Sequence, residues 1–341
     1  MDGATPAHRF ADVSAILPLY NGRRHLLDAV RSIAGQSLLP RELIVVDDGS
    51  GDDGASLLDE LAAPFPIMVV KQPNAGQSAA RNHGARLSTQ PYLAFLDQDD
   101  LWLPEHLTVL MAGIARNRLI SWVYGDFDEI DGQGRTVTKR FLREHAIPNP
   151  KTSLVACVSR DLMVIPSASL LRREVFVEVG GFDEELSGYE DDELFIRMFR
   201  AGYDHHYVDR TVTRFRIHTG SSSEDGRFIA SRLVFGRKLR ETIEDDRRFH
   251  RYYYRDVIVP RLFQQSLDDY VRFASAQHWS RALAARDAMN AFGAEHPGYR
   301  RKQWKLKLIQ DPARLRRALQ LQDHLPLGIT IFRNPAMRFR P

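Results

Sequence analysis

The stretch Tyr92-Leu93-Ala94-Phe95-Leu96-Asp97-Gln98-Asp99-Asp100 joins an apolar run to an acidic turn. The length and composition of the run predict a buried β-strand. Carboxylates clustered at the end of a strand repel one another unless a cation or protons neutralise them. An Asp-x-Asp pair supplies the hard oxygen ligands that Mg²⁺ or Mn²⁺ prefers, but an aspartate here also suits the cap of a helix beginning near Pro104. The turn is therefore either a site for a divalent ion or a solvated helix cap.

The residues before this turn alternate between strand and helix patterns. Strands are expected over residues 13–17, 43–46 and 67–70 as well as 92–96, the first of them stopping at Pro18. Helices are expected around residues 26–34, 57–61 and 77–87. This order predicts an α/β fold with a Rossmann-like, mostly parallel central sheet flanked by helices. Ligand sites in such sheets lie beyond the carboxyl ends of the strands. The polar groups that follow strand ends should therefore share one edge, and they are Asn21, Asp47-Asp48 and Asp97–Asp99.

The second half of the chain is less regular between Trp122 and Val164. Short helices are expected over residues 173–179 and 190–200. Strand-helix alternation stops after Gly220-Ser221-Ser222-Ser223, and the remainder has a mainly helical pattern. We therefore expect one domain over residues 1–222 and a helical C-terminal extension over 223–341.

Composition narrows the class of protein. The 341 residues are 43% hydrophobic and 27% charged, which is typical of a globular chain. A net charge of only +3 argues against nucleic acid as a partner. Cys157 is the single cysteine, which excludes a disulfide framework and a cysteine-ligated zinc site. With no apolar run long enough for a signal core or a membrane span, the expected location is cytoplasmic, with peripheral contact at the inner face of the membrane as a further expectation.

Six segments in series resemble the family 2 glycosyltransferases with the GT-A fold. The resemblance covers about residues 12–223 and implies an inverting enzyme that uses a nucleotide-sugar donor. The segments are Ser14–Asn21, Leu43–Ser50, Asn74–Gly84, Phe95–Asp100, Gly180–Glu184 followed by Glu190-Asp191, and Arg216–His218 followed by Ser221–Ser223.

The resemblance implies a role for each strand-end group. Asp99 is expected to bind Mn²⁺ or Mg²⁺, Asp97 to contact the ion or the ribose, and Asp100 to be a capping residue. His218 is expected as a further metal ligand, although a lone loop histidine is equally an ordinary surface residue. The residues expected around the nucleotide, with uracil the usual base, are Pro18, Tyr20, Asn21, Asp47, Asp48, Asn74, Gly76, Arg81 and Asp97.

Three of these assignments have open alternatives. Asp47-Asp48-Gly49-Ser50 is also a good turn-forming sequence. Arg81 is as well suited to an internal salt bridge as to a phosphate contact. Gly76 likewise could serve only the geometry of its turn.

A second acidic run, Glu190-Asp191-Asp192-Glu193, begins the helix at 190–200. The helix dipole favours acids at this end, and Ser187 with Glu190 fits a capping box. Transfer to a hydroxyl needs a base that removes its proton. The resemblance places that base at Asp191, with Glu190 as an orienting or acceptor contact. Asp192 and Glu193 are expected to face solvent.

The sequence thus predicts a metal-dependent, inverting glycosyltransferase. It would move a sugar from a nucleoside-diphosphate sugar, with UDP favoured, to a hydroxyl of a glycan or lipid-linked acceptor in cell-surface polysaccharide or glycolipid synthesis. The absence of a Gln-x-x-Arg-Trp motif after residue 191 favours a single-addition enzyme over a processive synthase.

Three alternatives remain in view. They are a nucleotidyltransferase on a similar fold, a binding protein without turnover, and a receiver domain, whose double aspartate the pair Asp47-Asp48 imitates. The strand-helix unit before Asp47 and the second acidic run at 190 argue against the receiver domain. Intact Asp99 and Asp191 argue against a binding protein without turnover.

Two C-terminal features each allow two interpretations. Residues 300–317 carry eight basic residues and a single acid, Asp311, with Trp304 interleaved. This stretch suits either contact with an anionic lipid or glycan, or a solvated helix face. Tyr252, Tyr253 and Tyr254 either pack their own domain or contact sugar.

Overall fold

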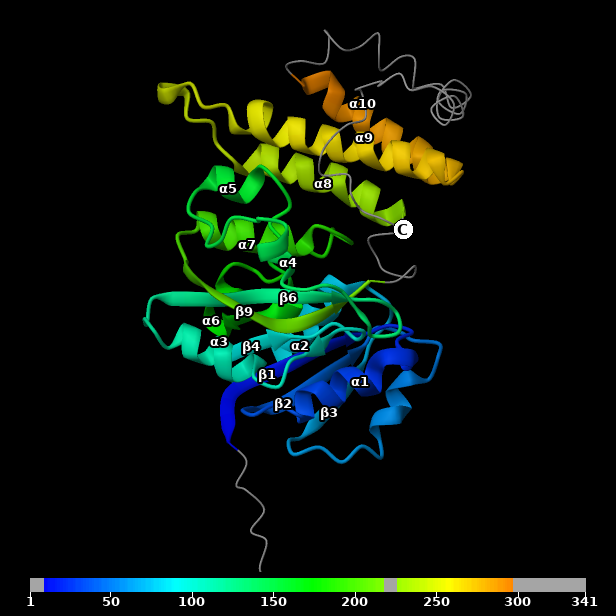
Figure 1. Cartoon of the computed structure of the whole chain (residues 1–341), viewed down its shortest axis with the longest axis vertical. Helices are drawn as coiled ribbons and strands as arrows, with labels where there is room; N and C mark the ends of the chain where they lie inside the picture. Colours follow the sequence, from blue (N-terminus) through cyan, green and yellow to red (C-terminus); the bar gives the residue numbers. More distant parts are fainter. Residues whose placement is uncertain (1–8, 218–225, 297–341) are drawn as a thin grey trace, which may run out of the picture. The chain divides into compact units, whose positions relative to one another are not determined.

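The computed structural model describes residues 9–217 and 226–296 (Figure 1). The chain divides into two compact units, Met1–Glu244 and Asp245–Pro341. The expected boundary near 222 falls before helix α8 (Gly226–Thr242), which the structure places in the first unit. No described helix has the length and apolar character needed to cross a membrane.

The first unit is an α/β structure around one sheet. Its strands, among the described residues, are β1 (Phe10–Leu19), β2 (Leu39–Asp47), β3 (Ile67–Lys71), β4 (Tyr92–Phe95), β5 (Leu101–Trp102), β6 (Ile120–Ile130), β7 (Thr136–Thr138), β8 (Ser169–Arg172) and β9 (Asp204–Arg216). Its helices are α1 (Arg23–Ala34), η1 (Gly54–Leu58), α2 (Gln77–Leu87), α3 (His106–Ile114), α4 (Phe141–Glu144), α5 (Leu154–Val158), η2 (Pro166–Ala168), α6 (Arg173–Glu178), α7 (Glu190–Arg200) and α8.

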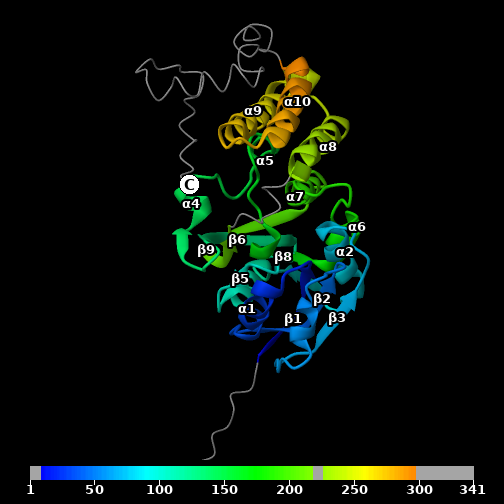
Figure 2. The ribbon, with the colours of Figure 1, turned by 90° about the vertical axis from the view of Figure 1, so that its right-hand side faces the viewer.

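The strand order is β3-β2-β1-β4-β8-β6-β9-β5, with β7 on β6. The chain first builds β1, β2 and β3 in one direction and then crosses back to place β4 on the other side of β1. Because parallel crossovers are right-handed, this reversal puts α1 and α2 on opposite faces of the sheet, as Figure 2 shows. The carboxyl ends of β1 and β4 therefore form a topological switch point, where ligands bind in such sheets.

The first four strands are parallel, as the sequence predicts. Ile16 of β1 is in register with Ile44 of β2 and with Phe95 of β4. Coverage on both faces explains why the runs Leu43–Val46 and Leu93–Leu96 are apolar at every position and fully buried.

Strand β1 does not stop at Pro18, as the sequence suggested, but continues to Leu19. The backbone of Ile16 faces β4, since its carbonyl accepts the Leu96 amide at 2.9 Å. Pro18 faces the same side two residues later, where pairing with β4 has ended. Its missing N–H therefore costs no ladder hydrogen bond.

The second half of the sheet was not predicted as such. Strand β8 runs antiparallel to both β4 and β6, while β6 is parallel to β9. The long strand β6 was missed because Asp126 lies in its middle. That carboxylate is fully buried and accepts the backbone N–H groups of Phe127 and Leu142, each at 2.8 Å. A buried, hydrogen-bonded acid breaks the apolar pattern without breaking the strand.

The helix expected around residues 57–61 is wrong in extent, because only the short 3₁₀ helix η1 forms there. Asp52 fixes the turn before it by accepting the N–H groups of Arg23 at 2.8 Å and Gly54 at 3.0 Å. Pro64 then disfavours helical geometry in the residue that precedes it.

The described part of the second unit contains η4 (Arg247–Phe249), a π-helical turn η5 (Tyr254–Ile258), α9 (Val259–Ser275) and α10 (Trp279–Glu295). Helices α9 and α10 pack as an antiparallel pair. Large side chains of α9, including Leu262 and Tyr270, are buried, and so is a stripe of small ones on α10, Ala282, Ala285 and Ala288.

His106 gives the first unit a pH-dependent stability. Its ring is buried, stacks on Trp102 at 4.2 Å, and contacts the carbonyl of Val212. Burial lowers the pKa of His106 to about 3. Below pH ~6.5 this imidazole is therefore protonated in the unfolded chain but stays neutral in the folded chain. We expect the free energy of unfolding to decline below that pH, by up to about 1.4 kcal/mol per pH unit.

The measurement is urea unfolding between pH 7 and pH 5, with a His106→Gln variant alongside. The glutamine variant should start less stable at pH 7 and lose less on acidification. An equally steep decline in both proteins would assign the effect to other groups.

Candidate functional site

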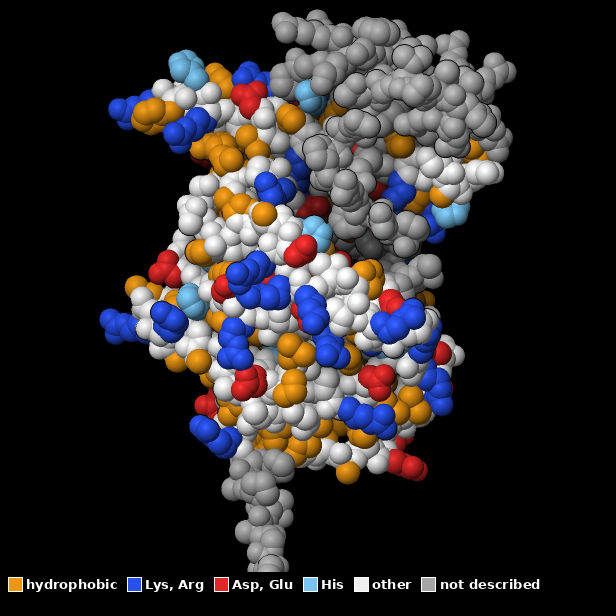
Figure 3. Space-filling view, viewed as in Figure 1, with side chains coloured by type: hydrophobic (Ala, Val, Ile, Leu, Met, Phe, Trp, Pro, Cys, Tyr) orange, Lys and Arg blue, Asp and Glu red, His pale blue; other side chains and the backbone are white. Residues whose placement is uncertain are grey.

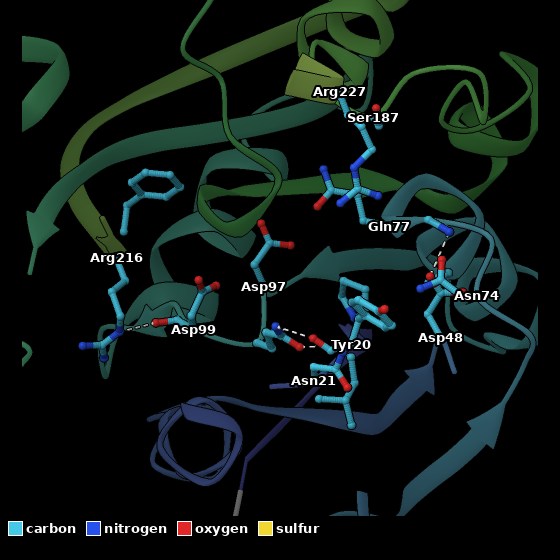
Figure 4. A pocket seen from close by; sticks show the side chains of 16 residues that line it. Tyr20, Asn21, Asp48, Asn74, Gln77, Asp97, Asp99, Ser187, Arg216 and Arg227 are labelled. Atoms are coloured by element: carbon cyan, nitrogen blue, oxygen red, sulfur yellow. Dashed lines mark hydrogen bonds between the residues drawn. The ribbon is translucent and has the colours of Figure 1, made fainter. Parts of the chain in front are cut away.

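A cavity of about 540 Å³ opens at the switch point between β1 and β4 (Figure 4). Its lining comes from the segments that follow the first four strands and from three later segments. The lining residues are Pro18, Leu19, Tyr20, Asn21, Asp48, Asn74, Gly76, Gln77, Ala80, Asp97, Gln98, Asp99, Ser187, Phe215, Arg216 and Arg227. The structure thus brings together seven of the residues expected around a nucleotide, but not Asp47 or Arg81.

Asp48 fixes one end of this cavity. Its carboxylate accepts the backbone N–H groups of Ala75 and Gly76 and the side-chain amide of Gln72, each at 2.8 Å. These bonds fold the loop between β3 and α2 back over the end of β2, and Gly76 adopts a φ of +93° there. Asp47 instead accepts the Ser50 N–H at 2.9 Å and is buried in its own turn. The turn-forming interpretation thus describes Asp47, while Asp48 faces the cavity.

The end of β1 is clamped to the acidic turn by Gln98. Its side-chain oxygen accepts the Tyr20 N–H at 2.8 Å, and its NH₂ group donates to the Tyr20 carbonyl at 3.0 Å. Asn21 continues the connection, because its side chain accepts the Gly51 N–H at 2.8 Å. The segments that follow β1, β2 and β4 are therefore hydrogen-bonded to one another.

Asp97 and Asp99 both reach the cavity, and Asp100 does not. In Figure 4 Asp97 lies centrally, with Asp99 and Arg216 on one side and Asp48 and Asn74 on the other. Asp100 is buried and accepts the backbone N–H of Arg216 at 2.9 Å. Burial raises the pKa of Asp100, and the charges of Asp99 and Asp97 add to the effect. Asp100 thus fastens the end of β9 to the acidic turn.

Asp97 and Asp99 fit a divalent ion that a substrate helps to hold. Magnesium typically takes one or two carboxylates and completes its shell with water and substrate phosphates. Among the described residues no group of three or more His, Cys, Asp or Glu side chains is arranged to hold an ion. The expected ligand His218 lies outside the described residues.

Arg81 lies beneath the cavity and connects its two acidic regions. The side chain is only 1% exposed and forms ion pairs with Asp97 at 2.6 Å and Glu190 at 3.0 Å. Burial alone would lower the pKa of Arg81, but these two carboxylates raise it above its ordinary value. The structure therefore shows the internal salt bridge that the sequence left as an alternative, and Glu190 also accepts a hydrogen bond from Gln77.

Other side chains of α2 hold the segment that leads to Glu190. Asn82 donates to the Phe182 carbonyl and accepts the Phe182 N–H, both at 2.8 Å. Gly181 has a φ of +72°, and a Cβ there would overlap the Asn82 side chain. These contacts join the segment at residues 74–84 to the segment at 180–184.

Asp191 begins helix α7 beside Glu190 and is half-buried, outside the lining of the cavity. Burial raises its pKa well above that of an ordinary aspartate, and the neighbouring charges of Glu190 and Asp192 raise it further. A carboxylate with a raised pKa is a better proton acceptor near neutral pH than an unperturbed one.

Two expectations for this helix are wrong. The Ser187 capping box does not form, because the N-cap is Tyr189 in a left-handed conformation and it has no side-chain cap. Asp192 does not face solvent, because it is buried and accepts the Leu162 N–H at 2.9 Å. Glu193 is paired with Arg197 at 2.5 Å.

Several cavity residues were missed by the sequence analysis. Gln98 could have been found from its place between two aspartates, and Gln77 from its place beside Gly76. Ser187, Phe215 and Arg227 come from segments far along the chain, and no local pattern marks them. Arg227 projects from α8 into the cavity above Asp97 (Figure 4).

This sheet, with its carboxylates around a cavity at the switch point, is that of a GT-A glycosyltransferase. Residues 14–180 match the model of the family described as glycosyl transferase family 2, and the chain belongs to this family. The crystal structure of S. aureus TarS 1-349 in complex with UDP-GlcNAc has the same fold, with a TM-score of 0.62 and 15% identity over 91% of each chain.

Two curated relatives are also similar to this chain. An uncharacterised glycosyltransferase of Rickettsia conorii is 27% identical over 216 residues, covering 62% of this chain and 35% of that protein. A chondroitin synthase of Escherichia coli is 25% identical over 191 residues, covering 56% of this chain and 27% of that protein. The similarity therefore spans about a third or less of the length of these two relatives.

Proposed function

We propose that this chain transfers a sugar from a nucleoside-diphosphate sugar to a hydroxyl of a glycan or lipid-linked acceptor, with inversion at the anomeric carbon. The observation that carries the proposal is the gathering of Asp48, Asp97 and Asp99 on one cavity, joined through Arg81 to a second acidic site at Glu190 and Asp191. The first group suits a donor nucleotide, and the second suits an acceptor hydroxyl. The pathway we favour is the synthesis of cell-surface polysaccharide or glycolipid.

UDP is the favoured donor nucleotide. The fold matches a TarS structure in complex with UDP-GlcNAc, which supports a donor of this class. In the present chain Asp48 faces the cavity at the end of β2, where a carboxylate can accept a hydrogen bond from a base N–H. Tyr20 is 46% exposed at the cavity and offers an aromatic face for the base.

Mn²⁺ or Mg²⁺, held by Asp99 and Asp97, would neutralise charge on the departing diphosphate. Arg227 offers a guanidinium at the same cavity and suits a phosphate oxygen. Arg81 holds the Asp97 carboxylate in place at the cavity through their ion pair at 2.6 Å.

Asp191 is proposed as the base. The acceptor oxygen bonds to the anomeric carbon as its proton passes to the Asp191 carboxylate. The bond from that carbon to the diphosphate breaks, and the nucleoside diphosphate leaves with the electron pair. One displacement of this kind inverts the anomeric centre.

The test is a panel of UDP-, GDP- and dTDP-sugars, each with Mn²⁺, with Mg²⁺ or with a chelator. We expect a UDP-sugar with metal to raise the melting temperature and to release UDP slowly by hydrolysis. Stabilisation by free ligand follows its concentration relative to its dissociation constant, so about 2.7 kcal/mol is expected at a hundredfold excess over that constant. If no nucleotide sugar stabilises the protein with either metal, the proposal is wrong.

A further inference from the structure

A projecting turn of the second unit concentrates basic and aromatic side chains. Residues 246–255 read Asp-Arg-Arg-Phe-His-Arg-Tyr-Tyr-Tyr-Arg, and we call this segment the aromatic-basic tip. It contains four arginines, three tyrosines and a phenylalanine against one aspartate. In Figure 1 the tip extends away from α9 and α10, and Figure 3 shows hydrophobic and basic side chains side by side on it.

The tip has a defined backbone. The Asp246 N–H donates to the Arg251 carbonyl, and the Arg251 N–H donates back to Asp246, both at 2.9 Å. The Asp246 side chain accepts the Phe249 N–H at 3.3 Å. His250 takes a left-handed conformation with a φ of 54°, which closes the turn. The only acid of the tip is therefore engaged in holding the turn.

Phe249 lies at the apex of this turn and is 62% exposed. The guanidinium groups of Arg248 and Arg251 lie 5.6 and 5.7 Å from its ring centroid. Arg247, Arg248 and Arg251 are all exposed, whereas Arg255 is paired with Asp256 at 2.7 Å. The apex thus presents one large apolar ring flanked by the exposed cations of Arg248 and Arg251, with exposed Arg247 in the same turn.

We propose that the aromatic-basic tip binds the surface of a membrane that contains anionic lipids. Arginines near such a surface are attracted to the headgroups, and an aromatic ring at the apex can enter the boundary between headgroups and acyl chains. The half-buried Tyr252, Tyr253 and Tyr254 are amphipathic rings of the kind that lie at this boundary. Charge complementarity alone would equally suit a soluble polyanion, but an exposed ring at the apex specifically favours an interface with an apolar interior.

The experiment uses the full chain with vesicles of phosphatidylcholine alone and with phosphatidylglycerol added, followed by flotation. We expect binding to the anionic vesicles only. Phe249→Ala should weaken it about tenfold, given the ring area removed from water. The double change Arg248→Gln and Arg251→Gln should weaken it about 25-fold, since each arginine near the surface contributes about fivefold.

Matched controls come from the same unit. Leu283→Ala removes a side chain that is also exposed, on α10, and Arg286→Gln removes a charge there; neither should alter vesicle binding. Because Phe249 is exposed, its replacement should leave the melting temperature unchanged. A Phe249→Trp variant provides an independent signal, because its fluorescence should shift to shorter wavelength with anionic vesicles and be quenched by brominated lipid.

Three outcomes would overturn the proposal. Phe249→Ala could bind anionic vesicles as well as the parent chain, Phe249→Trp could show no fluorescence shift beyond that of the parent chain on vesicles, or heparin could bind with the same dependence on Phe249. The last outcome would identify a soluble polyanion as the partner. Vesicle binding needs no nucleotide sugar, so these results are independent of the proposed transfer reaction.

Discussion

Replacement of Asp191 by asparagine is expected to reduce kcat for sugar transfer by about 10²- to 10⁴-fold, the usual contribution of a general base. Asparagine keeps the size of the side chain and loses only its ability to take a proton. UDP binding should change little, because Asp191 lies outside the lining of the nucleotide cavity. The measurements are steady-state kinetics with the donor found in the panel and calorimetric titration with UDP.

The pH dependence adds a second signature. The base must be deprotonated, so the rate rises with pH through the pKa of Asp191, which burial raises. We expect the acid limb of kcat/KM to lie at higher pH than for an ordinary aspartate and to be absent from the residual activity of the variant. Glu193→Gln, in the same helical turn, is the matched control and should retain activity. Loss of UDP binding in Asp191→Asn would instead show that this residue contacts the donor sugar nucleotide and not the acceptor hydroxyl.

Replacement of Arg81 by methionine is expected to lower the free energy of unfolding by about 3–5 kcal/mol, the cost of removing one partner from a buried ion pair. Methionine roughly preserves the length of the side chain and leaves the carboxylates of Asp97 and Glu190 without their cation. Arg86→Met, at an exposed position of the same helix, should change stability by less than about 0.5 kcal/mol. Urea unfolding at pH 7 measures both.

The dependence on pH separates lost charge from lost packing. Without Arg81, the carboxylates of Asp97 and Glu190 lack the cation that they share. The resulting destabilisation should be fully present at neutral pH and should shrink on acidification, because protonated carboxyls need no cation. A deficit that stays constant between pH 7 and pH 4 would show that packing, not charge, is what Arg81 contributes.

The parallel half of the fold could be predicted from sequence for a physical reason. Strands covered on both faces are apolar throughout, so Leu43–Val46 and Leu93–Leu96 stand out, and the polar groups after them fall at one edge. Asp48, Asp97 and Asp99 therefore meet at the cavity as expected. The strand containing Asp126 could not be recognised, because two of the backbone donors that satisfy its buried acid lie sixteen and seventeen residues away.

The site residues that could not be predicted also depend on contacts between segments far apart in the sequence. Whether Arg81 faces a ligand or an internal carboxylate depends on which side of α2 meets α7, and local spacing does not contain that information. The capping box at Ser187 failed because Tyr189 takes a left-handed conformation and starts the helix two residues later. Arg227 reaches the cavity because α8 packs against the start of α7, through contacts such as Phe235 stacked on Tyr189 at 4.9 Å.

The clamp formed by Gln98 restricts which sequences this family member can tolerate. The Gln98 amide donates to and accepts from the Tyr20 backbone, as a residue of a neighbouring strand would. Glutamate has the same shape, but it would place a carboxylate oxygen against the Tyr20 carbonyl, where a donor is needed. A Cβ at position 22 would overlap the same amide. Positions 22 and 98 are therefore a linked pair, and a side chain at the first would push the Gln98 amide out of the clamp. Compensating changes at these two positions should be recovered together in a library selected for folding, although 76 residues separate them in the sequence.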